Sequence, residues 1–389
     1  MQSNQCSFCG RSKSEVEMLV SGQEAYICNQ CIGQAYSIVK ESDSDTKNNK
    51  ELSLENLKKP REIKAFLDEY VIGQDRAKKQ LSIAVYNHYK RLLYTEKKEK
   101  NDVELEKSNI IMIGETGTGK TLLAKTIARE LDVPFCIVDA TVLTEAGYVG
   151  EDVESILSRL LMMSDYNVEK AEKGIVFIDE IDKIARKSDN PSITRDVSGE
   201  GVQQGLLKLL EGSIINVPPQ GGRKHPDQKY IQINTQNILF IAGGAFDGIQ
   251  DIIERRLNKQ VIGFNKEKIE KAGDKEEYVL SEINAIDLRA FGLIPELLGR
   301  FPIITYLDKL TKESMIRIMK EPKNSIVKQF VELFKMDGVE LEFTESAVNT
   351  IVEETLEKGL GARGLRGTTE KFLEDYMYNV GSEKKITLL

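Results

Sequence analysis

One segment constrains the fold of this chain more than any other, the Gly-rich run that ends at Thr121. The apolar stretch 110–113 precedes it and indicates a buried strand, whereas apolar residues recur at helical spacing from Leu122 to Leu131. The run therefore joins a strand to a helix. In that context, Gly-x-x-x-x-Gly-Lys-Thr lets backbone N–H groups and a helix N-terminus surround phosphate oxygens. The segment predicts a site for a nucleoside triphosphate.

The roles within this loop follow from phosphate chemistry. Lys120 is expected to contact the β- and γ-phosphates, and the Thr121 hydroxyl is expected to ligate Mg²⁺. A Gly-rich turn that arose by chance is the alternative, which the match of both flanks disfavours. We expect ATP as the nucleotide. The expected nucleotide-binding residues of the run are Gly114, Glu115, Thr116, Gly117, Thr118, Gly119, Lys120 and Thr121.

A second apolar strand, residues 175–178, ends in the acidic pair Asp179 and Glu180. At the carboxyl edge of a parallel sheet, Asp179 is expected near Mg²⁺ and Glu180 near the γ-phosphate. Glu180 can then polarise the attacking water as a general base. A solvated acidic strand end is the alternative, and the pairing with the phosphate loop disfavours it. Asp182 has a weaker claim, since it can simply cap the next helix.

Four of the five cysteines form two Cys-x-x-Cys pairs, Cys6 with Cys9 and Cys28 with Cys31, separated by 18 residues. This spacing is typical of two knuckles that fold around one tetrahedral Zn²⁺ with no open position for catalysis. Such a unit is too small for a sufficient core, so the metal would stabilise its fold. A redox-active pair is the alternative, but no βαβ pattern surrounds these cysteines.

Composition limits the class of protein. A length of 389 residues predicts two or three domains, and a formal charge of −8 disfavours a general nucleic-acid coat. Because neither a signal peptide nor a membrane-spanning run is visible, we expect a cytoplasmic location and no membrane partner. Residues 41–60 are polar and predict a mobile linker, and residues 97–107 predict a solvated charged loop.

Several further segments each carry two interpretations. Residues 147–150 place Tyr148 and Val149 between glycines, which indicates either a flexible exposed loop or a buried turn. The apolar cluster 261–264 stands among Lys and Glu, which indicates either a docking loop or an anchor in the core. Arg300 and Arg363 can each reach a nucleotide phosphate, and for each a surface arginine is the alternative.

Together these motifs resemble the ClpX family of AAA+ protein-unfolding ATPases over essentially the whole chain. The resemblance rests on the four-Cys unit, the nucleotide motifs, and four short segments at 147–150, 223–225, 262–264 and 361–363. It implies an α/β fold in which an AAA+ P-loop core with a parallel sheet is joined to a smaller α+β lid. The implied domains are a zinc-binding domain at 1–40, a flexible linker at 41–60, a large ATPase domain at 61–308 and a lid at 309–389.

The resemblance also implies roles for individual residues. Arg300 matches an arginine finger supplied to a neighbouring subunit, Arg363 matches the lid arginine called sensor 2, and Val71 and Ile72 match an adenine pocket. Other residues match loops that contact proteins. These are Tyr148 and Val149 on a pore loop that grips substrate, 195–201 on a second pore loop, Arg223, Lys224 and His225 on a pore-entrance loop that favours free carboxylate tails, and Ile262, Gly263 and Phe264 on a loop that docks on the ClpP peptidase.

Two positions depart from the family pattern. Glu115 stands where relatives commonly have Pro, which adds a negative charge beside the phosphate loop. Gly243 and Gly244 follow an apolar strand where many AAA+ proteins carry a polar sensor residue, so no sensor is assigned there.

The leading functional hypothesis is a homohexameric ATPase that threads tagged proteins through its pore and delivers them to a ClpP-type peptidase, with adaptors as further partners. A nucleic-acid motor or loader is the main alternative, and the acidic composition and the Tyr-Val loop count against it. A nucleotide switch without turnover is the third hypothesis, against which Glu180 and Arg300 argue.

Overall fold

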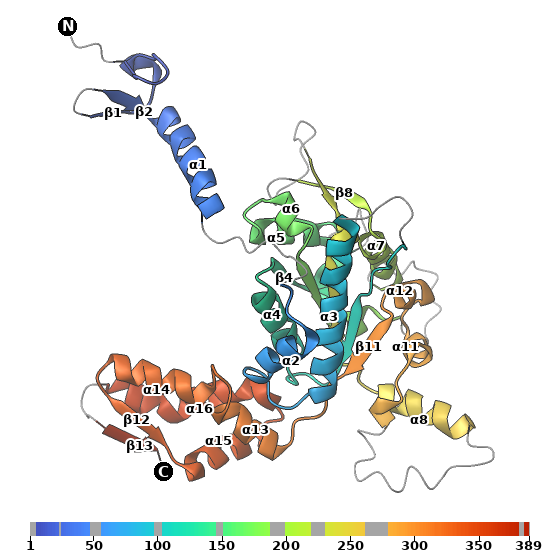
Figure 1. Cartoon of the computed structure of the whole chain (residues 1–389). Helices are drawn as coiled ribbons and strands as arrows, with labels where there is room; N and C mark the ends of the chain where they lie inside the picture. The colour runs from blue at the N-terminus through green and yellow to red at the C-terminus, as the bar shows by residue number, and fades with distance from the viewer. Residues whose placement is uncertain are drawn as a thin grey trace. The chain divides into compact units, whose positions relative to one another are not determined.

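The computed structural model describes residues 5–22, 25–46, 56–96, 103–144, 151–186, 199–218, 230–260, 279–380 and 385–388. The chain divides into two compact units, Met1–Leu57 and Lys58–Leu389 (Figure 1). Within the described residues, no helix combines the length and the apolar character that crossing a bilayer requires.

The first unit is a small antiparallel ribbon followed by one helix. Its strands pair Leu19 with Cys28 and Ser21 with Tyr26. Helix α1 continues to Thr46, so the first residues of the expected linker are helical, and residues 47–55 lie outside the described part. Its elements are η1 (Lys13–Glu15), β1 (Leu19–Ser21), β2 (Tyr26–Cys28) and α1 (Asn29–Thr46).

A five-stranded parallel sheet forms the centre of the second unit, in the order β11-β3-β10-β7-β4. Strands β3 and β10 are buried along their whole length, as expected for a parallel sheet covered by helices on both faces. The sequence prediction of a parallel core is confirmed. The strands are β3 (Ile110–Ile113), β4 (Phe135–Asp139), β7 (Ile175–Asp179), β10 (Leu239–Gly244) and β11 (Ile303–Tyr306).

Helices and short strands surround this sheet (Figure 1). Their bounds are α2 (Pro60–Asp68), α3 (Asp75–Glu96), α4 (Lys120–Leu131), α5 (Ser155–Met163), α6 (Val168–Ala171), α7 (Glu200–Glu211), α8 (Ile249–Gln260), α11 (Ala285–Phe291), α12 (Pro295–Gly299), η2 (Ala140–Val142), η3 (Ile181–Ile184) and η4 (Thr235–Asn237). The short strands are the parallel pair β5 (Leu143–Thr144) and β6 (Glu151–Asp152) and the hairpin β8 (Ile214–Val217) and β9 (Ile231–Asn234).

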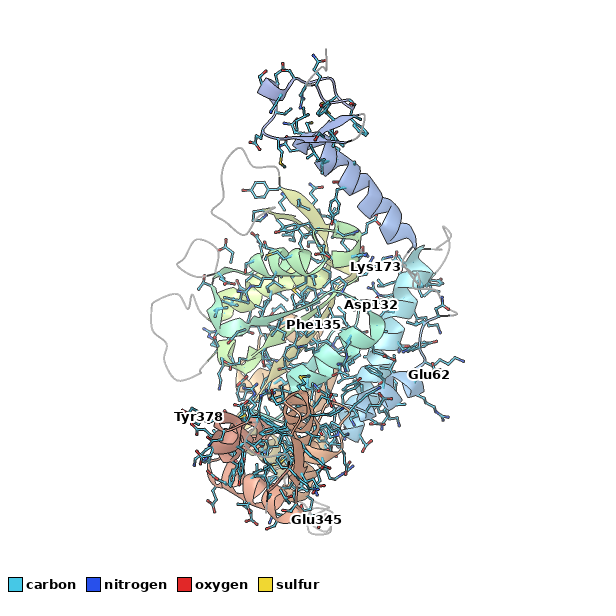
Figure 2. All side chains as sticks on the ribbon, turned by 90° about the vertical axis from the view of Figure 1, so that its left-hand side faces the viewer. Glu62, Asp132, Phe135, Lys173, Glu345 and Tyr378 are labelled. Carbon is cyan, nitrogen blue, oxygen red and sulfur yellow. The ribbon has the colours of Figure 1, made fainter. Side chains whose placement is uncertain are left out.

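The last part of the second unit is the predicted smaller α+β lid, with hydrophobic clusters of its own. Figure 2 shows its side chains gathered between helices, with Glu345 at the start of α15 and Tyr378 at the end of α16. Thr311, Ser325 and Thr344 cap three of these helices by accepting from backbone N–H groups. The elements are α13 (Lys312–Lys320), α14 (Ile326–Met336), β12 (Glu340–Phe343), α15 (Glu345–Glu357), α16 (Gly361–Tyr378) and β13 (Lys385–Leu388).

Three basic side chains converge on the successive carbonyl groups of η4, Thr235–Asn237. His88 Nε2 lies 3.0 Å from the last carbonyl oxygen, Arg91 donates to the middle one over 3.1 Å, and Lys107 donates to the first over 2.9 Å. Lys107 also lies 4.5 Å from the centre of the Phe240 ring. The expectation of a solvated loop is therefore wrong at Lys107, because carbonyls and an aromatic face replace its water.

We predict that His88 makes folding pH-dependent. Burial, with help from Arg91 and Lys107, lowers the pKa of His88 from 6.5 to about 3. The unfolded chain binds a proton as the pH falls below 6.5 while the folded chain does not, so stability falls. His88→Gln, whose amide can still donate to the carbonyl, should lose about 1 kcal/mol less than the parent between pH 7 and pH 5.5 in urea unfolding.

The control is His225→Gln, which removes the other histidine of the sequence. Its pH dependence, measured beside that of His88→Gln, separates the effect of His88 from the loss of any histidine. An equal loss of stability in His88→Gln and in the parent would contradict the assignment.

Candidate functional site

The phosphate loop connects β3 to α4 as predicted. Gly117 and Gly119 have φ angles of 89° and 104°, a backbone conformation that residues with a Cβ rarely adopt. Helix α4 begins at Lys120, whose ammonium group donates to the carbonyls of Gly114 and Glu115, the latter over 3.0 Å. These contacts hold the Lys120 ammonium group against the phosphate loop, which directly precedes Lys120 in the chain.

Thr121 and Asp179 bring the two halves of the candidate Mg²⁺ site together. The Thr121 hydroxyl donates to Asp179 Oδ2 over 3.2 Å. Two oxygens bound to one octahedral Mg²⁺ lie about 3.0 Å apart, so this pair has the spacing of adjacent ligands. The other Asp179 oxygen accepts from the backbone N–H of Glu180 over 3.0 Å. Glu180 itself is exposed and has a φ of 56°, which is uncommon for a residue with a side chain.

Strand β10 lies between β3 and β7, and its last two residues are Gly243 and Gly244, which have no side chains. A Cβ at Gly243 would lie 2.7 Å from Phe177 Cζ, and a Cβ at Gly244 would lie 2.6 Å from Asp182 Oδ1. Contacts this short do not occur, so the glycines leave the space that neighbouring side chains fill. Asp182, whose Oδ1 accepts from the N–H of Ala245 over 3.2 Å, places a carboxylate here that the sequence only weakly indicated.

Burial lowers the pKa of Lys120, and the positive charge of Arg363 acts in the same direction, whereas Asp179 opposes both. Arg363 is exposed and lies in the first turn of α16, which touches the phosphate loop. A Cβ at Gly117 would lie 3.4 Å from the Ala362 nitrogen. The structure therefore brings Arg363 near Lys120.

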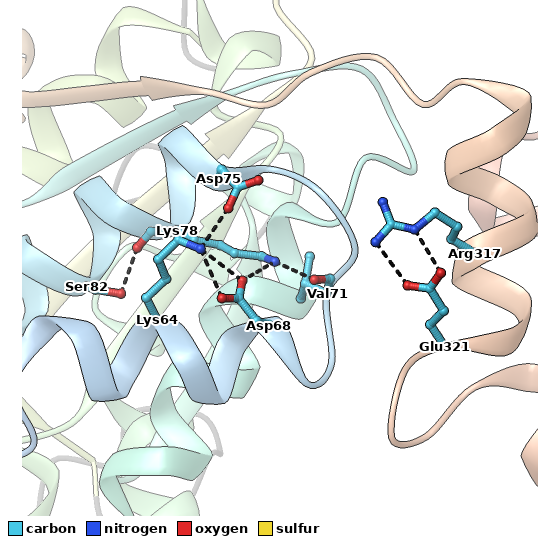
Figure 3. Close-up of polar contacts among 8 residues, drawn as sticks. All are labelled: Lys64, Asp68, Val71, Asp75, Lys78, Ser82, Arg317 and Glu321. Carbon is cyan, nitrogen blue, oxygen red and sulfur yellow. Dashed lines mark hydrogen bonds and ion pairs between the residues drawn. The ribbon is translucent and has the colours of Figure 1, made fainter.

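Val71 and Ile72 are buried in the turn between α2 and α3. The ammonium of Lys78 donates to the Val71 carbonyl and, over 2.7 Å, to Asp68 (Figure 3). Although burial acts to raise it, the ammonium groups of Lys78 and Lys64 hold the pKa of Asp68 below its ordinary value. The contacts of Lys78 with Asp68 and with the Val71 carbonyl thus hold the turn in place.

Gln74 ties this turn to the segment that leads into the lid. Its amide nitrogen donates to the Asp308 carbonyl over 2.8 Å, and its amide oxygen accepts from the Asp308 N–H over 2.7 Å. A second link joins Lys323 to Glu69, through a 2.7 Å backbone bond and a 3.1 Å ion pair. The sequence did not indicate this role of Gln74, because its partner lies 234 positions away.

The extra charge of Glu115 has a counterpart. Lys309 lies 3.5 Å from the Glu115 carboxylate, and both side chains are more than half exposed. Such a pair contributes little to stability, but it offsets negative charge beside the phosphate loop.

Arg300 lies at the amino-terminal ends of the strands, whereas the phosphate loop follows the carboxyl end of β3. The Asn109 side chain donates to the Arg300 carbonyl over 2.8 Å, and the guanidinium is paired with Glu211 at 2.8 Å. From Asn109 to Gly114 the extended strand covers about 16 Å. The structure therefore does not bring Arg300 to the phosphate loop of its own chain.

The residues expected to contact proteins lie outside the described part. They are Tyr148, Val149, Arg223, Lys224, His225, Ile262, Gly263 and Phe264. Of the expected second pore loop, residues 199–201 are described, with Gly199 preceding α7.

The four paired cysteines come together in the first unit, and their sulfur atoms all lie within 4.8 Å of one another. Sulfurs bound to one tetrahedral Zn²⁺ are about 3.8 Å apart, and Cys9 Sγ lies 3.7 Å from Cys28 Sγ. Backbone N–H groups of Cys28 and Cys31 point at the sulfurs of Cys6 and Cys28 over 3.3 and 3.5 Å. The Cys31 N–H lowers the pKa of Cys28, which favours the thiolate that a metal needs.

Three family models match the chain. They are the AAA domain (Cdc48 subfamily) at residues 105–304, the ClpX C4-type zinc finger at 4–41, and the C-terminal, D2-small domain of ClpB protein at 310–387. The chain is 61% identical over 383 residues to a protein of Bacteroides thetaiotaomicron named ATP-dependent Clp protease ATP-binding subunit ClpX, covering 98% of this chain and 92% of that protein. A Porphyromonas gingivalis protein of the same name is 58% identical over 388 residues, covering 99% and 93%.

We predict one Zn²⁺ per chain, held by Cys6, Cys9, Cys28 and Cys31. Cys28→Ser should reduce bound zinc below about half an equivalent in metal analysis of freshly purified protein, because a tetrahedral thiolate site loses one ligand. Cys136, a buried cysteine of β4, supplies the control, and Cys136→Ser should keep one equivalent. Less than half an equivalent in the parent would contradict the four-thiolate site.

Proposed function

The chain belongs to the ClpX family, and we propose that it is an ATPase that unfolds tagged proteins, moves them through the pore of a homohexamer and delivers them to a ClpP-type peptidase. The observation that carries the ATPase part of the proposal is the joint placement of Lys120, Thr121 and Asp179 at the carboxyl ends of the strands, with Glu180 beside them. Phosphoryl transfer needs mainly positioning and charge stabilisation, which these groups supply.

The proposed roles divide according to chemistry. Lys120 neutralises phosphate charge, Thr121 and Asp179 hold the Mg²⁺ that bridges the phosphates, and Glu180 orients the attacking water. Val71 and Ile72 form the apolar surface for adenine, in keeping with their burial beside the lid connection. Arg363 is proposed to contact the nucleotide from the lid, which its effect on the pKa of Lys120 supports.

Arg300 is proposed to complete the site of a neighbouring subunit. Support comes from its backbone contact with Asn109, which lies at the start of β3, a strand length of about 16 Å from Gly114 of the phosphate loop. In other phosphoryl-transfer systems an arginine supplied in trans raises the rate by about 10³ to 10⁵. A ring of subunits would satisfy this geometry.

The roles proposed for the loops that contact proteins rest on the family resemblance. We propose that Tyr148 and Val149 grip the moving polypeptide, that Arg223, Lys224 and His225 favour its free carboxylate, and that Ile262, Gly263 and Phe264 dock on the peptidase. Names of the relatives, which describe ATP-binding subunits of the Clp protease, support the last assignment.

For the nucleotide site we predict different outcomes for two variants. Lys120→Ala should weaken ATP binding, because it removes the cation that contacts phosphate, whereas Glu180→Gln should bind ATP and lose hydrolysis. Binding of a fluorescent nucleotide and steady-state ATPase measure the two effects. Equal ATPase rates in Glu180→Gln and the parent would overturn the assignment of Glu180.

The trans role of Arg300 is tested by mixing subunits. Rings of Arg300→Ala alone and of Glu180→Gln alone should be inactive, but mixed rings should regain ATPase. In such rings an intact site in one subunit meets an intact finger from its neighbour. No recovery in the mixture would count against action in trans.

A tagged, stable fluorescent protein tests the unfolding activity. Tyr148→Ala should keep ATPase but unfold this protein much more slowly, because Tyr supplies contact area at a small entropy cost. Phe264→Ala should unfold it normally but no longer support its degradation with the peptidase. Parental unfolding by Tyr148→Ala would remove its gripping role, and joint loss of ATPase and unfolding in Phe264→Ala would make Phe264 a core residue.

The same assay, run with and without DNA, separates the alternative of a nucleic-acid motor or loader. That alternative requires ATPase stimulated by DNA and no loss of fluorescence from the tagged protein.

A further inference from the structure

Gln203 is a polar side chain with no exposed surface, at the start of α7. Its amide nitrogen donates to the Ile184 carbonyl over 2.7 Å and lies 3.4 Å from the Gly292 carbonyl. Its amide oxygen accepts from the Ile294 N–H over 2.8 Å. A buried amide that is fully bonded in this way fixes the segments it touches, because each broken bond leaves a polar group unsatisfied.

The segments joined by Gln203 come from two different functional regions. Ile184 ends η3, which directly follows Glu180. Ile294 directly precedes α12, and Arg300 directly follows it. The same two segments also meet directly, since the Arg186 N–H donates to the Gly292 carbonyl over 3.0 Å. A Cβ at Gly292 would lie 2.4 Å from the Arg186 oxygen, so this close approach depends on glycine.

Helix α7 holds α12 at its other end as well. Glu211, the last residue of α7, pairs with the Arg300 guanidinium at 2.8 Å. Both side chains are about half exposed, so the pair orients the guanidinium more than it stabilises the fold. Helix α12 has only five residues and is too short to keep its geometry alone. Its position therefore depends on its contacts, which are the burial of Leu297 and Leu298 in the core and the bonds to α7.

We propose that Gln203 is a positioning residue for ATP hydrolysis in the neighbouring subunit. By fixing the start of α12 against η3, it sets the point from which Arg300 reaches out of its own chain. The proposal rests on the proposed trans role of Arg300. A displacement of about 1 Å in a group that stabilises the transition state can lower the rate on the order of 100-fold, so a loosened α12 is expected to impair hydrolysis without impairing nucleotide binding.

The adjacent residue provides a matched control. Gln204 is exposed, and its amide lies 3.3 Å from the Glu200 carboxylate in the preceding turn. Gln203→Met keeps the length of the side chain but removes all three contacts. We expect Gln203→Met to bind a fluorescent nucleotide with the parental affinity while its ATPase kcat falls about tenfold or more. Gln204→Met should match the parent in both measurements.

Mixed rings show at which site the defect acts. In a mixture with Glu180→Gln subunits, Gln203→Met subunits receive intact fingers, so their ATPase per active site should return toward the parental value. In a mixture with Arg300→Ala subunits no finger is intact, and activity should stay low. Parental ATPase in Gln203→Met, or no recovery with Glu180→Gln, would overturn the proposal.

Two further comparisons keep the outcome clear. If Gln203→Met does not fold by circular dichroism, Glu211→Gln tests the exposed end of the same connection, and it must show the same recovery pattern with a smaller defect. If Arg300→Ala and Glu180→Gln recover activity together but Gln203→Met and Glu180→Gln do not, only the role of Gln203 fails. If neither mixture recovers, the trans role of Arg300 fails first.

Discussion

The nucleotide site depends on one close approach, the contact of the Thr121 hydroxyl with the Asp179 carboxylate across the end of β10. Strand β10 lies between β3 and β7 in the sheet, so Thr121 in α4, which follows the loop after β3, meets the last residue of β7 past the end of β10. Gly243 and Gly244 end β10 without side chains, and a Cβ at these positions would collide with Phe177 and with Asp182, respectively. A polar side chain of the kind that many AAA+ proteins carry after this strand would meet the same obstruction.

The sequence was sufficient for the parts of the site that are local. The apolar runs of β3 and β7, the spacing of the phosphate loop and the two cysteine pairs each lie within a few residues, and the structure confirms the strands and brings the sulfurs together. Contacts between distant residues could not be predicted. Gln74 meets Asp308 across 234 positions and Gln203 meets Ile294 across 91, and neither amide differs in sequence from a surface glutamine.

The surroundings of basic side chains were the feature that the sequence predicted least well. Lys107 belongs to a charged run and was expected in solvent, and His88 lies on a helix whose turns are rich in charged residues. Both face carbonyls of η4, and burial lowers the pKa of Lys107 to about 7 and that of His88 to about 3. Only the fold shows that carbonyl dipoles replace water around these bases.

Arg300 and the lid are attached to the sheet by different kinds of contact, and the contacts determine which of the two can move. Asn109 and Gln203 join Arg300 and α12 to the sheet and to η3 through buried amides, so Arg300 is expected to move with the body that carries Glu180. The lid is attached through the bonds of Gln74 to Asp308 and through Lys323, which contacts Glu69 by a backbone bond and an exposed ion pair. Water can replace the ion pair at little cost. Rotation of the lid about Asp308 is therefore expected to require less free energy than movement of Arg300 relative to its sheet. A cycle of nucleotide binding and release is expected to change the place of Arg363 relative to Lys120 while leaving Arg300 fixed to its own sheet.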